Sequence, residues 1–217
     1  MLTLYHAPQS RSTRIIWLLE EAGADYAIET VGIRRRDPDA ERPDAPPIGA
    51  RDPANPHPHG KVPALVHDGV LVYESSAIVA YLGDLFPEAG LAPPIGAPER
   101  GPYLSWLAYY AGTIEPAFVS AFLGVEESGP SVGWTSVAAV DAHIEAALAQ
   151  GPYFLGERFS GVDVLIGSML AFFVGSPLMP HSPALDGYVG RITARPAYGR
   201  AMRIDAGEDA RDGEPAA

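Results

Sequence analysis

Cysteine is absent from the 217 residues of this chain. The protein therefore has no disulfide, no thiolate ligand for a metal and no cysteine nucleophile. Any catalysis through a thiol of its own is excluded, and a chain without cysteine fits a reducing compartment.

Long apolar runs and positive charge are also scarce. No stretch is both apolar and long enough to cross a bilayer, and no basic N-terminal region precedes an apolar one. We therefore expect a soluble, cytoplasmic protein with no membrane partner. The formal net charge of −12 repels nucleic acid as well as anionic membranes, so we expect no nucleic-acid partner. An anionic small molecule must be held by local features of a site.

Residues 64–78 predict a hairpin followed by a helix. Two runs rich in β-branched residues, 64–66 and 70–73, flank Asp68-Gly69, a dipeptide that tolerates the positive φ angles of a tight turn. Ser75 is a good N-cap, and apolar residues then recur at helical spacing until Pro87.

The start of this helix suits a charged ligand. Free N–H groups and the partial positive charge at a helix N-terminus favour a carboxylate, and Glu74 lies beside them, ready for an ammonium group. Pro63 precedes the first strand of the hairpin, where proline is tolerated. A cis bond after Val62 would turn the amide of Val62 outward, where it could pair with an extended peptide.

The residues before the hairpin predict a βαβ unit. A strand over 2–5 leads through a loop to an amphipathic helix over 15–22, and a second strand covers 26–31. Ser10 or Ser12 could cap the helix. Residues 34–58 are crowded with Pro, Asp and Arg, and predict a long irregular segment with one short helix near 48–51.

The composition changes to that of a linker at 87–98, and the rest of the chain is predicted to be helical. One helix covers 98–125 and is bent at Gly112 and Pro116, and another covers 131–150. Further helices are predicted over 164–174, 184–193 and 197–204, before a charged tail over 205–217 that we expect to be poorly ordered.

A second specific pattern precedes the helix over 164–174. Ser160 and Asp163 have the spacing of a capping box, in which each side chain accepts a hydrogen bond from a free backbone N–H. Phe159 and Val164 occupy the two positions of a hydrophobic staple. These features stabilise the start of a helix and carry no chemistry.

The pairs Val62-Pro63 and Glu74-Ser75, at this spacing and within this hairpin, closely resemble the glutathione-binding segment of cytosolic glutathione S-transferases. The resemblance covers about residues 1–204 and is closest to serine-type, theta-like bacterial members. It implies an α/β N-terminal thioredoxin-like domain followed by an all-α domain. The expected limits are 1–86 for the first domain, 87–97 for the linker, 98–204 for the helical domain and 205–217 for a flexible tail.

The resemblance also implies that a hydroxyl near the first helix stabilises the glutathione thiolate. Lowering a thiol pKa of about 8.5 by about 2 units takes roughly 3 kcal/mol of preferential anion stabilisation. Ser10 is the first candidate because of its spacing from Tyr5 and Arg14. Tyr5 is the second, with core packing as its alternative, and Ser12 is the third, with helix capping as its alternative.

The remaining glutathione contacts follow from the same resemblance. Lys61 corresponds to a basic residue near the glycine carboxylate, and its alternative role is that of a solvated surface lysine. The expected glutathione-binding residues are Arg11, Lys61, Val62, Pro63, Glu74 and Ser75. Asn55, His57 and His59 lie where family members reach the same carboxylate, but the segment before them is longer and richer in proline than is usual. We expect no metal site.

Trp106 and Tyr110 lie on the helix predicted over 98–125, which the family places beside the electrophile pocket. They are therefore the expected members of that pocket. An aromatic stripe at helical spacing is also typical of a core or a dimer contact.

The sequence thus predicts a homodimeric glutathione transferase that acts in detoxification and adds the glutathione thiolate to a small apolar electrophile. Other glutathione-dependent reactions remain open: peroxide reduction, isomerisation or dehalogenation. So does a non-catalytic, transferase-like binding protein.

Overall fold

The computed structural model describes residues 1–37, 39, 47–125 and 131–208. The chain divides into two compact units, residues 1–82 with the segment that begins at Pro196, and residues 83–195. Within the described ranges, no helix is long and apolar enough to cross a membrane. The predicted tail lies, from residue 209 onward, outside the described residues, and the predicted domain limits stay predictions.

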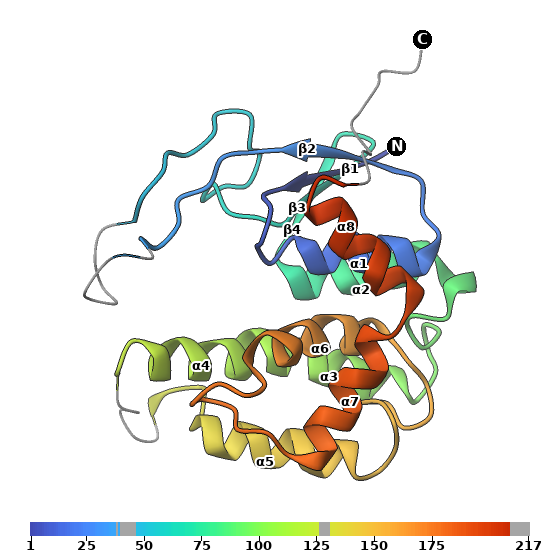
Figure 1. Cartoon of the computed structure of the whole chain (residues 1–217). Helices are drawn as coiled ribbons and strands as arrows, with labels where there is room; N and C mark the ends of the chain where they lie inside the picture. The colour runs from blue at the N-terminus through green and yellow to red at the C-terminus, as the bar shows by residue number, and fades with distance from the viewer. Residues whose placement is uncertain (38, 40–46, 126–130, 209–217) are drawn as a thin grey trace. The chain divides into compact units, whose positions relative to one another are not determined.

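The first unit is built on a four-stranded sheet in the order β2-β1-β3-β4. β1 runs parallel to β2 and antiparallel to β3, and β4 is antiparallel to β3. Figure 1 shows α1 and α2 on the same side of this sheet. The elements are β1 (Leu2–His6), α1 (Thr13–Ala22), β2 (Tyr26–Thr30), β3 (Ala64–His67), β4 (Val70–Tyr73) and α2 (Ser75–Leu85). The predicted thioredoxin-like order is confirmed.

Burial explains why these residues form these elements. On β1, Leu2 and Leu4 alternate with half-buried neighbours, as expected of a strand with one buried face. In α1 the run Ile15–Leu19 is completely buried. At the tip of the hairpin, Asp68 and Gly69 have φ angles of 48° and 82°, the positive values that the sequence predicted.

The last helix, α8 (Pro196–Asp205), packs against α1 in this first unit. The rings of Trp17 and Tyr198 meet edge to face with centroids 5.1 Å apart. Arg200 Nε donates to the buried Glu20 carboxylate over 2.7 Å. The last helix of the domain predicted over 98–204 therefore packs on α1, near the N-terminus of the chain.

Two local predictions were wrong. No helix forms over 48–51, because Ile48 exchanges two backbone hydrogen bonds of 2.8 Å with Arg35 and Gly49 has a φ of 85°. The N-cap of α2 falls on Glu74, whose carbonyl accepts from the N–H of Ile78 over 2.9 Å, and Ser75 is the first helical residue.

The second unit is helical, as predicted. Its helices are α3 (Arg100–Tyr109), α4 (Glu115–Phe122), α5 (Val137–Leu148), α6 (Gly161–Phe173) and α7 (Pro183–Thr193), with a short 3₁₀ turn at Pro87–Ala89. The position of the bend predicted at Gly112 lies in a π-helical segment, Tyr110–Ile114, between α3 and α4. α5 begins later than predicted because Ser136 accepts from Ala139 N and caps it there.

The predicted capping box is confirmed. Ser160 Oγ accepts from the N–H of Val162 over 3.2 Å, and Asp163 Oδ2 accepts from the N–H of Ser160 over 2.8 Å. Asp163 is fully buried, and its Oδ1 also accepts from Phe154 N and from the Tyr188 hydroxyl, both over 3.1 Å. This carboxylate therefore joins three segments of the second unit.

Candidate functional site

The register of the sheet brings the predicted site segments to one end of it. Tyr5 on β1 lies opposite Ala64 on β3, and Ala64 lies opposite Tyr73 on β4. The loop that follows β1, the residues before β3 and the residues after β4 therefore meet at the same edge. These three segments carry Ser10, Val62-Pro63 and Glu74-Ser75.

Ser10 lies in the loop between β1 and α1 with its side chain half-buried. Its Oγ accepts from the N–H of Ser12 over 3.1 Å and lies 2.7 Å from Ser12 Oγ. The preceding residue, Gln9, has a φ of 54°, a left-handed conformation that is uncommon outside glycine. The Ser10 hydroxyl is thus held in a fixed position at the start of α1.

Ser12 is completely buried and occupies the N-cap position of α1, yet its side chain does not cap the helix. Instead, its Oγ accepts from Ala7 N over 3.2 Å and lies 2.8 Å from His6 Nδ1. Complete burial favours a supporting role for Ser12 over direct contact with a ligand.

His6 continues this chain of hydrogen bonds into the core. Burial lowers the pKa of His6 below its ordinary value, with Asp205 raising it and Arg35 lowering it further, so the ring is neutral at pH 7. Its Nε2 faces Asp205 Oδ1 at 3.4 Å. A proton on Nε2 faces this carboxylate favourably although the two atoms make no hydrogen bond, and in that tautomer Nδ1 accepts from Ser12.

Asp205 and Arg35 hold the loop itself. Both carboxylate oxygens of Asp205 accept from the N–H of Gln9, over 3.2 and 3.1 Å, and Oδ1 also accepts from the Thr13 hydroxyl. Arg35 donates to the carbonyls of Pro8 and Gln9. Sequence reasoning missed His6, Arg35 and Asp205, and had assigned Asp205 to the flexible tail.

The other predicted residues near the sulfur lie as follows. Tyr5 is half-buried on β1, and Arg11 has an exposed side chain between Ser10 and Ser12. Their roles stay predictions.

The loop before β3 is shaped by the polar residues that precede it. Asn55 is 3 % exposed, and its side chain donates to Lys61 O over 3.0 Å and accepts from His57 N over 3.0 Å. His57 is equally buried against the ring of Tyr73, and its Nδ1 accepts from His59 N. Asn55 and His57 therefore support the loop from behind, while Lys61 projects an exposed side chain from it.

Two further observations concern the peptide bond before β3 and the possibility of a metal site. The Val62–Pro63 peptide bond is cis. Among the residues that the structure describes, no group of three or more His, Asp or Glu side chains could hold a metal ion.

Glu74 and Ser75 stand at the start of α2, as the sequence requires. Glu74 is exposed, with a φ of 71°, and Ser75 is 9 % exposed. Together they present a carboxylate, a hydroxyl and the free N–H groups of the first helical turn at one point.

The two residues predicted for the electrophile pocket lie in the second unit. Tyr110 is 1 % exposed. Trp106 stacks on His143 with centroids 4.8 Å apart and also contacts the rings of Tyr109 and Phe154. These contacts favour the packing alternative for Trp106, and the pocket assignment stays a prediction.

Comparisons with known proteins match both parts of the chain. Residues 10–85 match the family described as glutathione S-transferase, N-terminal domain, and residues 124–198 match its C-terminal domain. A glutathione transferase from Methylococcus capsulatus is 31 % identical, with 95 % of this chain and 99 % of that one covered and a TM-score of 0.70.

Two solved structures with bound glutathione are also similar. A sphingomonad glutathione S-transferase in complex with glutathione is 29 % identical, with 94 % of this chain and 98 % of that one covered and a TM-score of 0.69. A theta class enzyme from Xanthomonas axonopodis pv. citri, with glutathione bound, is 28 % identical, with coverages of 93 % and 96 % and a TM-score of 0.67.

Proposed function

The chain belongs to the glutathione S-transferase family, and from this premise we propose that it transfers the thiolate of glutathione to a small apolar electrophile. The enzyme is a glutathione transferase with glutathione as its co-substrate. The electrophile and the residues that act on the sulfur are the proposed part.

One observation supports the proposal most. The β1–β3–β4 register brings the loop that carries Ser10, the residues just before β3 and the start of α2 to the same end of the sheet. Glutathione offers matching groups, namely a thiol, peptide bonds, and the ammonium and carboxylate of its γ-glutamyl end. In this arrangement Glu74 takes the ammonium, Ser75 and the α2 amides take the carboxylate, and Val62 pairs with the peptide.

The chemistry needs a thiolate. The Ser10 hydroxyl donates to the sulfur while its oxygen keeps the hydrogen bond from Ser12 N. This donation stabilises the anion, so the thiol releases its proton to water at a lower pH. The sulfur lone pair then forms a bond to the electrophilic carbon, and the leaving group departs with the electron pair of the broken bond.

Calorimetry with glutathione tests the site. Glu74→Ala and Ser75→Ala are each expected to weaken binding by roughly tenfold or more, since each removes a hydrogen bond to a charged group. The control is Ser105→Ala, which changes an exposed serine on α3 whose hydroxyl donates to Gly101 O of the same helix. Unchanged affinity in both site variants would refute the site.

A panel of electrophiles and hydroperoxides separates the reactions. Conjugation of apolar electrophiles at rates above those with peroxides is the expected result, and activity with peroxides alone would replace transfer by reduction. Binding of glutathione without any turnover would favour the non-catalytic alternative.

We also propose that the enzyme acts in the cytoplasm, in detoxification, as a homodimer. Family membership and the absence of cysteine support this setting. Light scattering at micromolar concentration is expected to give twice the chain mass, and the mass of one chain would contradict the dimer.

A further inference from the structure

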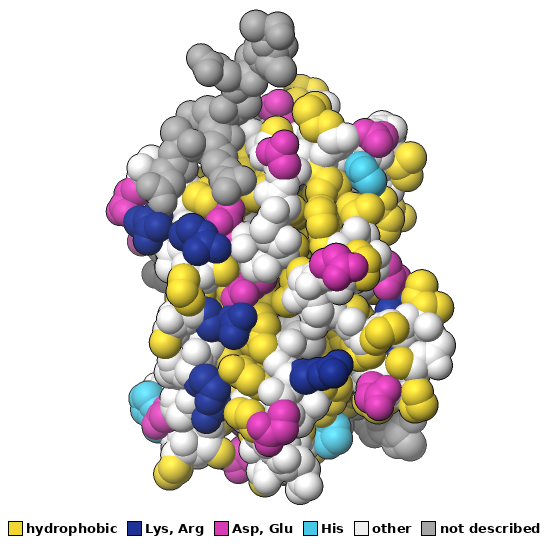
Figure 2. Space-filling view, turned by 90° about the vertical axis from the view of Figure 1, so that its right-hand side faces the viewer, with side chains coloured by type: hydrophobic (Ala, Val, Ile, Leu, Met, Phe, Trp, Pro, Cys, Tyr) yellow, Lys and Arg dark blue, Asp and Glu magenta, His cyan; other side chains and the backbone are white. Residues whose placement is uncertain are grey.

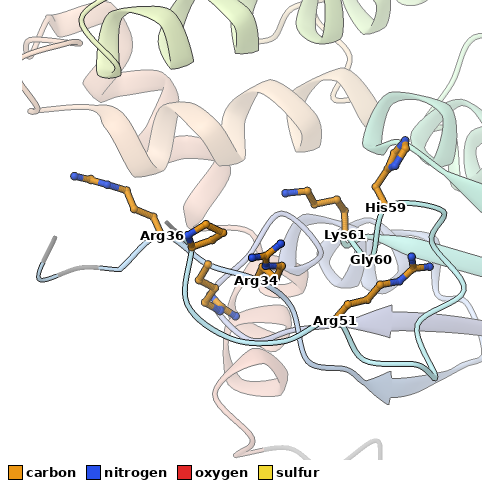
Figure 3. A pocket seen from close by; sticks show the side chains of 8 residues that line it. Arg34, Arg36, Arg51, His59, Gly60 and Lys61 are labelled. Carbon is orange, nitrogen blue, oxygen red and sulfur yellow. The ribbon is translucent and has the colours of Figure 1, made fainter. Parts of the chain in front are cut away.

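A pocket of about 330 Å³ in the first unit is lined almost entirely by basic side chains. Its charged or titratable lining residues are Arg34, Arg35, Arg36, Arg51, His59 and Lys61, and among the residues that the structure describes no acidic one lines it. Figure 3 shows these side chains coming from two separate segments, one after β2 and one before β3. We call this site the basic pocket.

The concentration of charge is unusual for this chain. The sequence holds 15 Lys and Arg against 27 Asp and Glu, and five of those cations line this one pocket. On the face shown in Figure 2, by contrast, basic side chains lie among acidic ones. Gathering like charges destabilises a fold through repulsion, so the cluster is a functional feature to be explained.

The backbone contacts of Arg35 and Arg51 leave their charges in place. Arg35 donates to the carbonyls of Pro8 and Gln9, and Arg51 donates to the carbonyl of His57 over 3.1 Å. These acceptors are neutral, so they orient the guanidinium groups without balancing them.

Two cations are freer still. The exposed side chains of Arg34 and Lys61 have no hydrogen-bond or ion-pair partner within the described part of the chain. Their charges are therefore available to a ligand.

Under the proposed function, glutathione brings a single negative charge to this pocket, the glycine carboxylate beside Lys61. One carboxylate cannot balance Arg34, Arg35, Arg51 and Lys61 together. Arginine, moreover, matches the planar oxygen pairs of carboxylate, phosphate and sulfonate groups. We propose that the basic pocket binds a second anionic group together with glutathione. This inference rests on the proposed function only in taking glutathione as the source of the first anionic group. The pocket and its charge do not depend on Ser10 or on turnover.

The second anionic group has two possible sources, a free small anion or an acidic substituent on the electrophile. Calorimetry with inorganic pyrophosphate, with and without saturating glutathione, tests the first source on the full chain. Pyrophosphate is expected to bind in both conditions, and Arg34→Gln should weaken it about tenfold by removing a charge-assisted hydrogen bond. Arg158→Gln, which makes the same change of net charge in the other unit, should leave the affinity unchanged.

Paired electrophiles test the second source. A chlorodinitrobenzene with a carboxylate substituent is compared with its uncharged analogue in the wild type, Arg34→Gln and Arg158→Gln. If the electrophile carries the anion, Arg34→Gln lowers kcat/KM about tenfold for the carboxylated compound only. If the anion is free, Arg34→Gln lowers pyrophosphate affinity alone.

Three outcomes overturn the inference. One is the absence of pyrophosphate binding together with no selective loss for the carboxylated electrophile. The second is equal pyrophosphate affinity in the wild type and Arg34→Gln. The third is full displacement of pyrophosphate by glutathione, which would reduce the pocket to a site for the glycine carboxylate. Pyrophosphate binding without any glutathione binding would instead contradict the proposed function and leave an anion site standing.

Discussion

Ser12 Oγ lies 2.7 Å from Ser10 Oγ, and the N–H of Ser12 donates to the same Ser10 oxygen over 3.1 Å. Ser12 is in turn held by His6, whose Nδ1 lies 2.8 Å from its hydroxyl. With the His6 proton on Nε2, Ser12 donates to the ring and accepts from the Ser10 hydroxyl, so Ser10 turns its hydrogen from Ser12 to the thiolate when glutathione binds. The orientation of Ser10 is therefore set by a buried residue two positions away.

Ser12→Ala should disturb both stability and the sulfur site. It leaves His6 Nδ1 buried without a donor, which is expected to lower the free energy of unfolding by about 1–3 kcal/mol, as measured in urea. The pKa of bound glutathione should also rise, because Ser10 loses its contact with Ser12 Oγ and is then oriented by the backbone N–H of residue 12 alone. A Ser12→Ala protein with wild-type stability and thiol pKa would show that Ser12 does not orient Ser10.

Asp205→Asn should loosen the loop that carries Ser10. It removes the negative charge that faces His6 Nε2 and weakens the bonds to Gln9 N and the Thr13 hydroxyl. We expect the free energy of unfolding to fall by about 1–2 kcal/mol and the pKa of bound glutathione to rise by about half a unit, with little change in glutathione affinity.

Asp186→Asn is the matched control for this change. Asp186 is exposed and pairs with the exposed His181, an ion pair that contributes little to stability. If both variants lost the same stability and neither moved the thiol pKa, the role of Asp205 in the loop would be disproved.

Asp141 gives a pH-dependent prediction. Burial, and then the charge of Glu145, raise the pKa of Asp141 from 3.8 to about 6, and its Oδ1 has no hydrogen-bond partner among the described residues. The folded protein thus holds this proton to higher pH than the unfolded chain does. Stability from this group is present below pH 3.8 and is lost as pH rises to about 6.

Asp141→Asn removes that loss. Above pH 6 it should be more stable than the wild type by on the order of 1 kcal/mol, after allowance for solvent screening, and the difference should vanish near pH 4. Urea midpoints across this range measure it. A gain that is the same at every pH would mean that the ionisation of Asp141 is not its cause.

Asp163→Ala should destabilise the second unit without altering the chemistry of the molecules that remain folded. The side chain accepts from Ser160 N, Phe154 N and the Tyr188 hydroxyl, all buried, so we expect a loss of about 3 kcal/mol or more in thermal or urea unfolding. Activity per folded molecule should be unchanged. A variant with native stability and no activity would reverse this assignment.

Local patterns predicted the local structure of this chain. The Asp68-Gly69 turn and the Ser160–Asp163 capping box depend on residues within a few positions of one another, and both are confirmed. The prediction of a short helix near 48–51 was wrong because Ile48 pairs with Arg35, a contact that local periodicity does not encode.

The supports of the candidate site could not be predicted for the same reason. Asp205 bonds the N–H of Gln9 from 196 positions away, and as a charged residue near the end of the chain it has the pattern of a solvated tail. His6 likewise has the pattern of a loop residue, and becomes part of the site only when Asp205 and Ser12 are folded around it.

The most direct test of the account is the pKa of glutathione bound to the enzyme, followed by the ultraviolet absorbance of its thiolate as pH is varied. If Ser10 is the main donor to the sulfur, Ser10→Ala raises this pKa by about one to two units, the equivalent of one hydrogen bond to a charged group. Tyr5→Phe should move it much less. A large rise in Tyr5→Phe with none in Ser10→Ala would contradict the account and make Tyr5 the donor.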